Sequence, residues 1–292
     1  MGPGAICRVL KQADRGFITS RGYRKATTRA RSARALSDSL LIRRDTACAC
    51  GTISRATASA QCGTRLSRKG FYIDRDKTAR LMKLAGVSGR RRGRTPVTTI
   101  IPKTPDHRPD LVQRDFCAQA PGRLWVADIT YVRTLSGFAY TACVVDVYSR
   151  KIVGVATRST MRTDALPMKA LEHALTTAGR NHGNQLIHHS DRGSQYVSWE
   201  YSTALAESGI RPSVGTAGDS YDNALAETVN GLYKAELIHA QGPWTSAGEV
   251  ELATLRWVHW WNTKRLHEAL DYATPQEVET EYYLTQPINT GS

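Results

Sequence analysis

Three short stretches decide the fold: LWVADIT at residues 124–130, HSDRGSQY at residues 189–196 and DNALAE at residues 222–227. Each places one carboxylate in or beside an apolar segment, and these are Asp128, Asp191 and Glu227. The three acids are separated by 62 and 35 residues, so only a tertiary fold can bring them together. Carboxylate oxygens are the ligands that Mg²⁺ and Mn²⁺ prefer. We therefore predict that these acids hold two divalent ions, an arrangement suited to phosphodiester chemistry.

Each acid also has an ordinary structural interpretation. An aspartate within a strand is unusual and costly when buried, but Asp128 could face water at a sheet edge. Asp191 could be a simple turn aspartate, and Glu227 could lie on a solvated helix face. The helical spacing of Asn223, Glu227, Asn230 and Lys234 favours function, because such a polar stripe suits phosphate and metal better than a core.

Four further residues compete for the same site. Asp146 follows an apolar run and is an alternative to Asp128, although a structural pairing with Arg150 at the following turn is the preferred interpretation. Asp222 is an alternative to Glu227, but its place near the start of a helix favours a role as N-cap. His188 and His189 could orient a metal-bound water, and we leave both outside the predicted metal shell.

The hydrophobic pattern around the acids predicts an α/β domain. Expected strands cover residues 124–132, 138–147, 151–156, 185–188 and 210–214. Expected helices cover residues 164–177, 198–208 and 220–237. This order indicates a mixed five-stranded sheet with helices on its faces, within a catalytic domain of residues 123–285.

Charge divides the 292-residue chain into two unlike parts. Residues 1–114 hold 26 Lys/Arg, 7 Asp and no Glu, whereas residues 115–292 hold 14 Lys/Arg and 19 Asp/Glu. A strongly basic half joined to a mildly acidic one predicts a DNA-binding arm attached to a catalytic body. The sequence shows no signal peptide and no run of 18 apolar residues, so we expect a cytoplasmic, nucleoid-associated protein.

The DNA-binding region expected within the basic half, residues 1–94, is predicted to be mainly helical. A helix capped by Asp74 or Asp76 and ending near Gly86 resembles the second helix of a helix-turn-helix, although an ordinary solvated helix remains the alternative. The expected DNA contacts are Arg75, Lys77, Arg80, Lys83, Arg90, Arg91, Arg92 and Arg94. Residues 44–69 show no regular period and are expected to be poorly ordered. The prolines of residues 95–122 indicate a linker.

The six cysteines do not form a recognisable ligand set. Cys48 and Cys50 lack the spacing of a zinc knuckle, and no histidine lies within thirty residues of them. We therefore expect neither a disulfide nor a zinc site.

The acids and their surroundings resemble the DDE transposases of bacterial insertion sequences, the OrfB type, whose catalytic core is shared with retroviral integrases. The resemblance rests on WVADITY at residues 125–131, HSDRGSQY at residues 189–196, and Glu227 with Lys234 seven residues later. The tail WNTKRLH at residues 261–267, followed by Leu270 and Thr274-Pro275, extends the resemblance, which covers about residues 71–285.

This resemblance implies a ribonuclease-H-like fold and Mg²⁺-dependent cutting of DNA followed by strand transfer from a 3′-hydroxyl. It implies that Asp128, Asp191 and Glu227 are the metal ligands and that Lys234 contacts DNA. It also implies a homo-oligomer on paired DNA ends, with an upstream-frame protein as a further partner. Members of the family usually carry a well-patterned helical segment just before the position of Gly70-Phe71, and residues 44–69 lack it. This departure favours one alternative, a non-catalytic DNA-binding remnant. A second alternative is a metal-dependent nuclease that cuts without joining.

Overall fold

The computed structural model describes residues 55–84, 110–113, 115–178, 185–191, 193–215 and 224–286. Within these ranges the strands form one five-stranded sheet in the order β3-β2-β1-β4-β5. The strands are β1 (Leu124–Thr134), β2 (Gly137–Asp146), β3 (Ile152–Arg158), β4 (Ile187–Ser190) and β5 (Arg211–Val214). β1, β2 and β3 are antiparallel neighbours, whereas β4 and β5 run parallel to β1. The mixed α/β sheet predicted from the sequence is confirmed, and its order is that of the ribonuclease-H-like fold.

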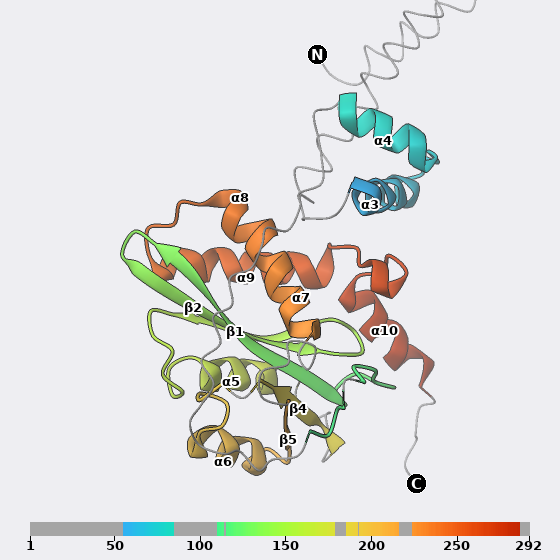
Figure 1. Ribbon diagram of the computed structural model, residues 1–292. Coiled ribbons are helices and arrows are strands. Elements are labelled where there is room, and N and C mark those ends of the chain that lie inside the picture. The colour runs from blue at the N-terminus through green and yellow to red at the C-terminus, as the bar shows by residue number, and fades with distance from the viewer. Residues whose placement is uncertain are drawn as a thin grey trace, which may run out of the picture.

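Helices cover both faces of this sheet (Figure 1). One face packs against α5 (Pro167–Ala178) and α6 (Trp199–Glu207), and the other against α7 (Ala224–Tyr233) and α9 (Ala247–Thr263). Successive side chains of β1 alternate between the two cores, because neighbouring residues of a strand point to opposite faces. Val126 accordingly belongs to the core under α7 and α9, whereas Trp125 and Ala127 belong to the core under α5.

The contact of α5 with β3 depends on Gly154. A Cβ at this position would lie 2.2 Å from the carbonyl oxygen of Ala170 and 2.7 Å from the Cβ of Ala174. Because the first obstacle is helix backbone, Gly154→Ala is expected to displace α5 and lower the free energy of unfolding by about 1–3 kcal/mol. Thermal unfolding would then occur roughly 2–12 °C lower.

Gly248 offers a matched control for this prediction. It lies in α9, and the nearest atom to an added Cβ is the Oγ of Ser246 at 3.9 Å. Gly248→Ala is expected to leave the unfolding temperature unchanged or slightly raised, because alanine suits a helix better than glycine. Equal effects of the two substitutions would contradict the close packing of α5 on β3.

The helix that carries Glu227 is shorter than the sequence predicts. α7 ends at Tyr233 and continues as a π-helix, η3 (Lys234–Ile238), and then as α8 (His239–Gln241). Its four residues from Ala235 to Ile238 are all buried, which one face of an α-helix does not allow. The wider π turn lets the buried Glu236 face the core together with its apolar neighbours. The chain ends in η4 (Glu268–Leu270) and α10 (Pro275–Thr285).

The expectation of poor order for residues 44–69 is wrong for its described part. Residues Arg55–Arg68 form the helix α3, which packs against α4 (Arg75–Leu84). The contact is made by Cys62 and Leu66 of α3 with Leu81 and Met82 of α4. The buried face of α3 consists mainly of small side chains. Its sequence therefore lacks the repeated large aliphatic residues that usually indicate a helix. Residues 44–54 lie outside the described ranges.

The capping aspartate of α4 is the first of the two candidates. Asp74 Oδ1 accepts a hydrogen bond of 2.8 Å from the backbone N–H of Lys77, which is an N-cap contact. The N–H donors at this helix end lower the pKa of the Asp74 carboxyl. Thr78, Leu81 and Met82 form the buried face, so α4 presents Arg75, Lys77, Arg80 and Lys83 to solvent.

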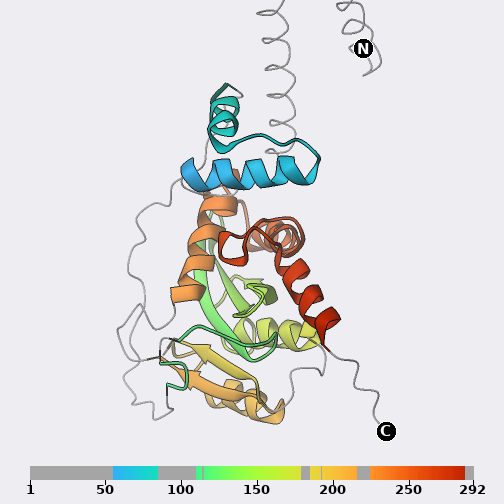
Figure 2. The same cartoon turned by 90° about the vertical axis from the view of Figure 1, so that its right-hand side faces the viewer.

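Helix α3 lies against the sheet domain (Figure 2) and is held there by its side chains. Gln61 Nε2 donates to the carbonyl oxygen of Leu266, and Arg65 Nη2 donates to that of Lys264, both at 2.6 Å. Arg68 forms an ion pair of 2.8 Å with Glu277 at the start of α10. The hairpin of α3 and α4 therefore rests on the segment between α9 and α10.

Part of the expected linker also lies against the body. The backbone N–H of Leu111 donates to Ser213 Oγ at 2.9 Å, and Val112 is buried in the core under α7 and α9. Phe116 packs edge-on against the ring of His189. Residues 95–109 are not described.

Two observations complete the description. Among the described residues no helix is both long and apolar enough to cross a membrane. Cys62, Cys117 and Cys143 are not in disulfides among the described residues, and the other three cysteines lie outside the described ranges.

Candidate active site

The first two acids are neighbours because β1 and β4 run parallel. Ala127 of β1 is the Cα partner of Ser190 of β4, and this is the last pair of the ladder. Asp128 and Asp191 are the residues that follow this pair in the two segments. Continuing the register by one residue places them side by side, at about the 4.8 Å spacing of neighbouring strands. This position at the carboxyl end of β4 is where ligands bind in open α/β sheets.

Asp128 is held by two hydrogen bonds. The backbone N–H of Ile129 donates to Oδ1, and Asn230 Nδ2 of α7 donates to Oδ2, both at 2.8 Å. The other amide atom of Asn230, Oδ1, is buried and has no hydrogen-bond partner among the described residues. One oxygen atom that accepts no hydrogen bond thus lies beside the first acid.

Asp191 and Glu227 approach from different elements. Asp191 Oδ1 accepts a hydrogen bond of 3.0 Å from the backbone N–H of Gly193, and a Cβ on Gly193 would lie 2.9 Å from that oxygen. Glu227 lies in the first turn of α7, three residues before Asn230. Residues three apart share a helix face, so Glu227 is on the side of α7 that contacts Asp128.

The pKa shifts show that the three acids act on one another. Burial raises the pKa of Asp128 to about 7, with a further rise from the charges of Asp191 and Glu227, although the two hydrogen bonds act in the opposite direction. Burial also raises the pKa of Asp191, and the pKa of Glu227 is raised by burial and by the charge of Asp191. Asp128 in β1 is therefore within electrostatic reach of both Asp191, after β4, and Glu227, in α7.

Lys234 is a cation that interacts electrostatically with Asp128. Its Nζ lies 4.8 Å from the ring centroid of Tyr131 on β1. Burial lowers the pKa of Lys234, and the charge of Asp128 raises it. The predicted stripe of Asn230, Glu227 and Lys234 is thus present on one helix, whereas Asn223 lies outside the described ranges. Tyr131 was not anticipated, because an aromatic residue in a strand gives no functional signal of its own.

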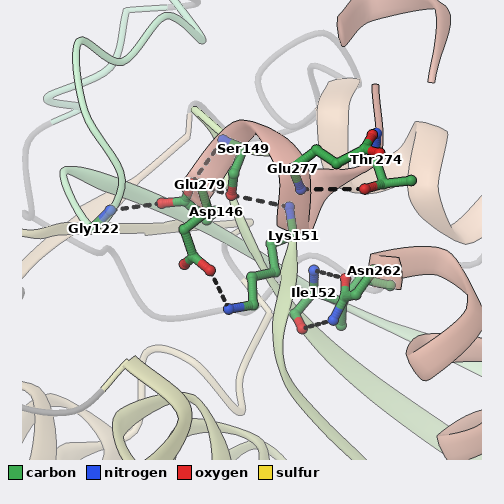
Figure 3. Close-up of polar contacts among 9 residues, drawn as sticks. All are labelled: Gly122, Asp146, Ser149, Lys151, Ile152, Asn262, Thr274, Glu277 and Glu279. Carbon is green, nitrogen blue, oxygen red and sulfur yellow. Dashed lines mark hydrogen bonds and ion pairs between the residues drawn. The ribbon is translucent and has the colours of Figure 1, made fainter. Parts of the chain in front are cut away.

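The alternative acid Asp146 has a structural environment (Figure 3). Its Oδ1 accepts from the backbone N–H of Gly122, and its Oδ2 accepts from the backbone N–H and hydroxyl of Ser149, at 2.7–2.8 Å. The expected partner Arg150 is not the residue that binds it, because the turn brings Ser149 and the backbone closer. Asp146 therefore fastens the turn after β2. Asp222, the alternative to Glu227, lies outside the described ranges.

The two histidines before Asp191 are also held by protein groups. His188 Nε2 is 3.0 Å from the hydroxyl of Tyr201, and His189 Nδ1 is 2.9 Å from Ser213 Oγ. Both rings are buried. His189 lowers the pKa of Asp191 through its charge, so it acts on the site electrostatically.

The predicted DNA contacts divide between described and undescribed residues. Arg75, Lys77, Arg80 and Lys83 lie exposed on α4 and are not part of the acidic site. Arg90, Arg91, Arg92 and Arg94 lie outside the described ranges.

The raised pKa of Asp128 predicts a pH-dependent stability. A carboxyl whose pKa is higher in the folded protein than its ordinary value of 3.8 binds more protons when folded. Its contribution to stability is therefore lost as the pH rises from about 4 to above 7. We expect Asp128→Asn to unfold roughly 3–8 °C higher than the native protein at pH 8 in EDTA, and at nearly the same temperature at pH 4.

The difference between the two unfolding curves is the quantity to measure, by differential scanning calorimetry across this pH range. Other carboxyls, such as Glu249, have lowered pKa values and give the opposite slope, but they cancel in the difference. Adding Mg²⁺ at pH 8 is expected to stabilise the native protein and not the variant. A difference in unfolding temperature that does not change with pH would contradict the raised pKa of Asp128.

The residues at this site suit a hydrated divalent cation. Hard carboxylate oxygens, a local excess of negative charge and the unpartnered Asn230 Oδ1 are the groups that such an ion and its water ligands would satisfy. Among the described residues no three His, Cys, Asp or Glu side chains are already gathered as a metal-ligand group. The two hydrogen bonds of Asp128 explain part of this, because both of its oxygens are directed at protein donors.

Known proteins share this sequence pattern. Two models of the integrase core domain match residues 118–220 and residues 208–275. A putative transposase for insertion sequence element IS986/IS6110 from Mycobacterium tuberculosis (strain ATCC 25618 / H37Rv) is 50% identical over 221 residues, which are 75% of this chain and 79% of the relative. The transposase for insertion sequence element IS629 from Shigella sonnei is 48% identical over 219 residues, 75% of this chain and 72% of the relative.

A solved structure was also found. A chain from the simian T-cell lymphotropic virus intasome in complex with PP2A regulatory subunit B56 gamma aligns with a TM-score of 0.47 at 16% identity, covering 82% of this chain and 77% of the other.

The sheet order and the matching family models define an integrase core protein. Because relatives about half identical in sequence are covered over more than two thirds of their length, the chain belongs to the insertion-sequence transposases with an integrase core domain. The family predicted from the three acid-containing stretches is confirmed.

Proposed function

We propose that this protein cuts DNA at the ends of an insertion sequence and joins the freed 3′-hydroxyl to target DNA, in a Mg²⁺-dependent or Mn²⁺-dependent reaction. The observation that carries the proposal is that the charges of Asp191 and Glu227 both raise the pKa of Asp128, although the three acids come from separate elements. Like charges close together at a partly buried site are costly unless a cation compensates them.

The three acids are proposed to hold two divalent ions. Bound there, the ions would lower the pKa of the attacking water or 3′-hydroxyl and neutralise the leaving oxygen. The protein's own groups fix the ligands: Asn230 and the backbone N–H of Ile129 orient Asp128, and the backbone N–H of Gly193 orients Asp191. Fixed ligands lower the reorganisation that the reaction needs.

Lys234 is proposed to bind the phosphate backbone next to the reacting bond. It is half-buried, and its ammonium group is placed by the ring of Tyr131 instead of an ion pair. A lysine ammonium is a compact point charge that suits phosphate. Its position one helix segment beyond Glu227 supports a contact close to the acids.

The partners follow from charge and family. The exposed basic side chains of α4 support binding of the element's ends through phosphates. Cutting two ends of one element requires two active sites, so a homo-oligomer on paired DNA ends is proposed. An upstream-frame protein is a further proposed partner, for which the residue contacts offer no support.

A strand-transfer assay tests this function. The full chain is incubated with Mg²⁺, a labelled pre-cut donor that carries the end of the element from the encoding locus, and an unlabelled target plasmid. We expect labelled products longer than the donor. Cutting of an uncut end without longer products would instead indicate a nuclease, and binding without either product would indicate a non-catalytic DNA-binding remnant.

A further inference from the structure

Beyond Asp128, β1 is no longer paired with β4, although β2 stays paired with β3 as far as Tyr140 and Arg158. The ladder between β1 and β4 ends at Ala127, whereas β1 and β2 remain paired as far as Thr134 and Gly137. In this outer part Tyr131 is opposite Tyr140. Cross-strand partners project from the same face of a sheet, so these two rings share a face.

The outer hairpin has one buried and one partly open face. Val132, Ala139 and Thr141 are buried on the side of α7 and α9, where the Thr141 hydroxyl is 3.3 Å from that of Tyr233. The opposite face carries the aromatic side chains, and Phe138, opposite Arg133, is 48% exposed. About half of the Phe138 side chain is therefore open to solvent.

The rings on the open face contact one another in a row. The centroids of Tyr131 and Phe138 are 5.8 Å apart, and those of Phe138 and Tyr140 are 6.5 Å apart. We call these three residues the aromatic row. Its first ring, Tyr131, lies under Lys234 Nζ, whereas the side chain of Asp128 projects from the opposite face of β1, towards α7.

The charges beside the aromatic row favour a polyanion. Lys234 is at one end, and Arg133 is exposed and has no ion-pair partner among the described residues. Arg158, opposite Tyr140, is already paired with Glu251, so it is not counted. Exposed aromatic rings beside cations are the combination with which proteins bind unpaired nucleic acid: bases stack on the rings while the backbone follows the positive charge.

We propose that Tyr131, Phe138 and Tyr140 bind unpaired bases of the DNA strand next to the reacting phosphodiester. This inference rests on the proposed function and adds to it that the end of the element is opened, not read as an intact duplex. The face of a base inside a duplex is covered by its neighbours, so stacking on a protein ring requires a base that has left the helix. The aromatic row would stabilise that opened state next to Lys234.

The experiment uses two forms of the element's end. One is fully paired, and the other carries mismatches in the three base pairs nearest the cut. 2-Aminopurine at the position beside the scissile bond reports stacking, because contact with an aromatic ring quenches its fluorescence. Binding is measured in EDTA, where no cutting occurs, and cutting is measured in Mg²⁺. The variants are Phe138→Ala and, as a control on another exposed aromatic residue, Trp199→Ala of α6, which is 80% exposed.

For the native protein and Trp199→Ala we expect strong quenching with both DNA ends. For Phe138→Ala we expect weaker quenching and cutting of the paired end slowed by about tenfold, with the deficit reduced to about twofold or less on the mismatched end. An equal deficit on both ends, or unchanged quenching, would overturn the proposal. If Phe138→Ala loses a dimer that the native protein forms in sedimentation, while quenching is unchanged, the aromatic row contacts a second copy of the chain. That result would also overturn the proposal.

The proposed function can fail separately from this inference. If the native protein quenches 2-aminopurine in EDTA but cuts neither end in Mg²⁺, the aromatic row binds DNA and the cutting proposal is wrong. If it cuts both ends but Phe138→Ala behaves as the native protein does, only the aromatic row is wrong.

Discussion

Replacing Asp191 by asparagine is expected to abolish cutting of the element's end, slowing it by about a thousandfold or more. The substitution keeps the shape of the side chain and an oxygen that can accept the hydrogen bond from Gly193, but it removes a negative charge. Without that charge the site should bind divalent ions weakly, and the pKa of Glu227 should fall towards its ordinary value, because Asp191 contributes to raising it. Binding of DNA by the basic half should change by less than about twofold.

The measurement compares nicking rates at saturating protein with affinity for the same DNA. Asp164→Asn is the matched control, since Asp164 is exposed on the surface and paired only with Arg162. Its nicking rate should remain within about twofold of the native rate. Asp191→Asn nicking at a rate close to that of Asp164→Asn would exclude Asp191 from the reaction.

Breaking the buried ion pair between Glu236 and Arg265 is expected to have the largest effect on stability. Arg265 donates to both carboxylate oxygens of Glu236, at 2.8–3.3 Å, and the Trp257 indole N–H donates to the same group. The Glu236 side chain is 1% exposed and that of Arg265 6%. Arg265→Met would leave a buried carboxylate without its cation, which typically costs about 3–5 kcal/mol. We expect unfolding roughly 6–20 °C lower.

This ion pair also connects the N-terminal hairpin with the helix of Glu227. Glu236 lies in the π turn that follows α7, and the carbonyls on either side of Arg265 receive the hydrogen bonds of Gln61 and Arg65. Loss of Arg265 should therefore also weaken the attachment of α3. Limited proteolysis between residues 55 and 84 should be faster in Arg265→Met than in the native protein.

A double variant distinguishes charge burial from packing. Glu236→Leu combined with Arg265→Met removes both charges, and it should recover at least half of the lost unfolding temperature, because apolar residues often replace a buried pair without loss. The surface variant Lys169→Met, which breaks an exposed pair with Glu172, should cost less than about 1 kcal/mol. A double variant less stable than Arg265→Met would contradict the expected cost of an unpaired charge.

The sheet could be predicted because its strands have strong local patterns. β-Branched and aromatic residues recur through 124–134 and 137–146, and each predicted strand lies within a few residues of the observed one. The parallel pairing that brings Asp128 beside Asp191 could not be read from the pattern, because Asp128 lies within its strand and only Asp191 follows a strand end. Spacing in sequence contains no information on strand order, so the resemblance to a known family was needed to place Glu227 with them.

Other features depend on residues far apart in sequence. The π turn is fixed by an ion pair between residues 29 positions apart, and the sequence around Glu236 is compatible with an ordinary α-helix. The helix α3 has an apolar face of small side chains that only α4 makes recognisable. Asp146 was given the wrong partner, because a backbone N–H donor such as that of Gly122 cannot be seen in a side-chain pattern.

The most direct test of the active site is to locate the metal. Crystals of the protein with the element's DNA end, grown in Mn²⁺, would give anomalous scattering peaks at each bound ion. We predict peaks in contact with carboxylate oxygens of Asp128, Asp191 and Glu227, which disappear in Asp191→Asn. Peaks held by other residues, or three carboxylates that face different sides of the domain with DNA bound, would contradict the proposed chemistry.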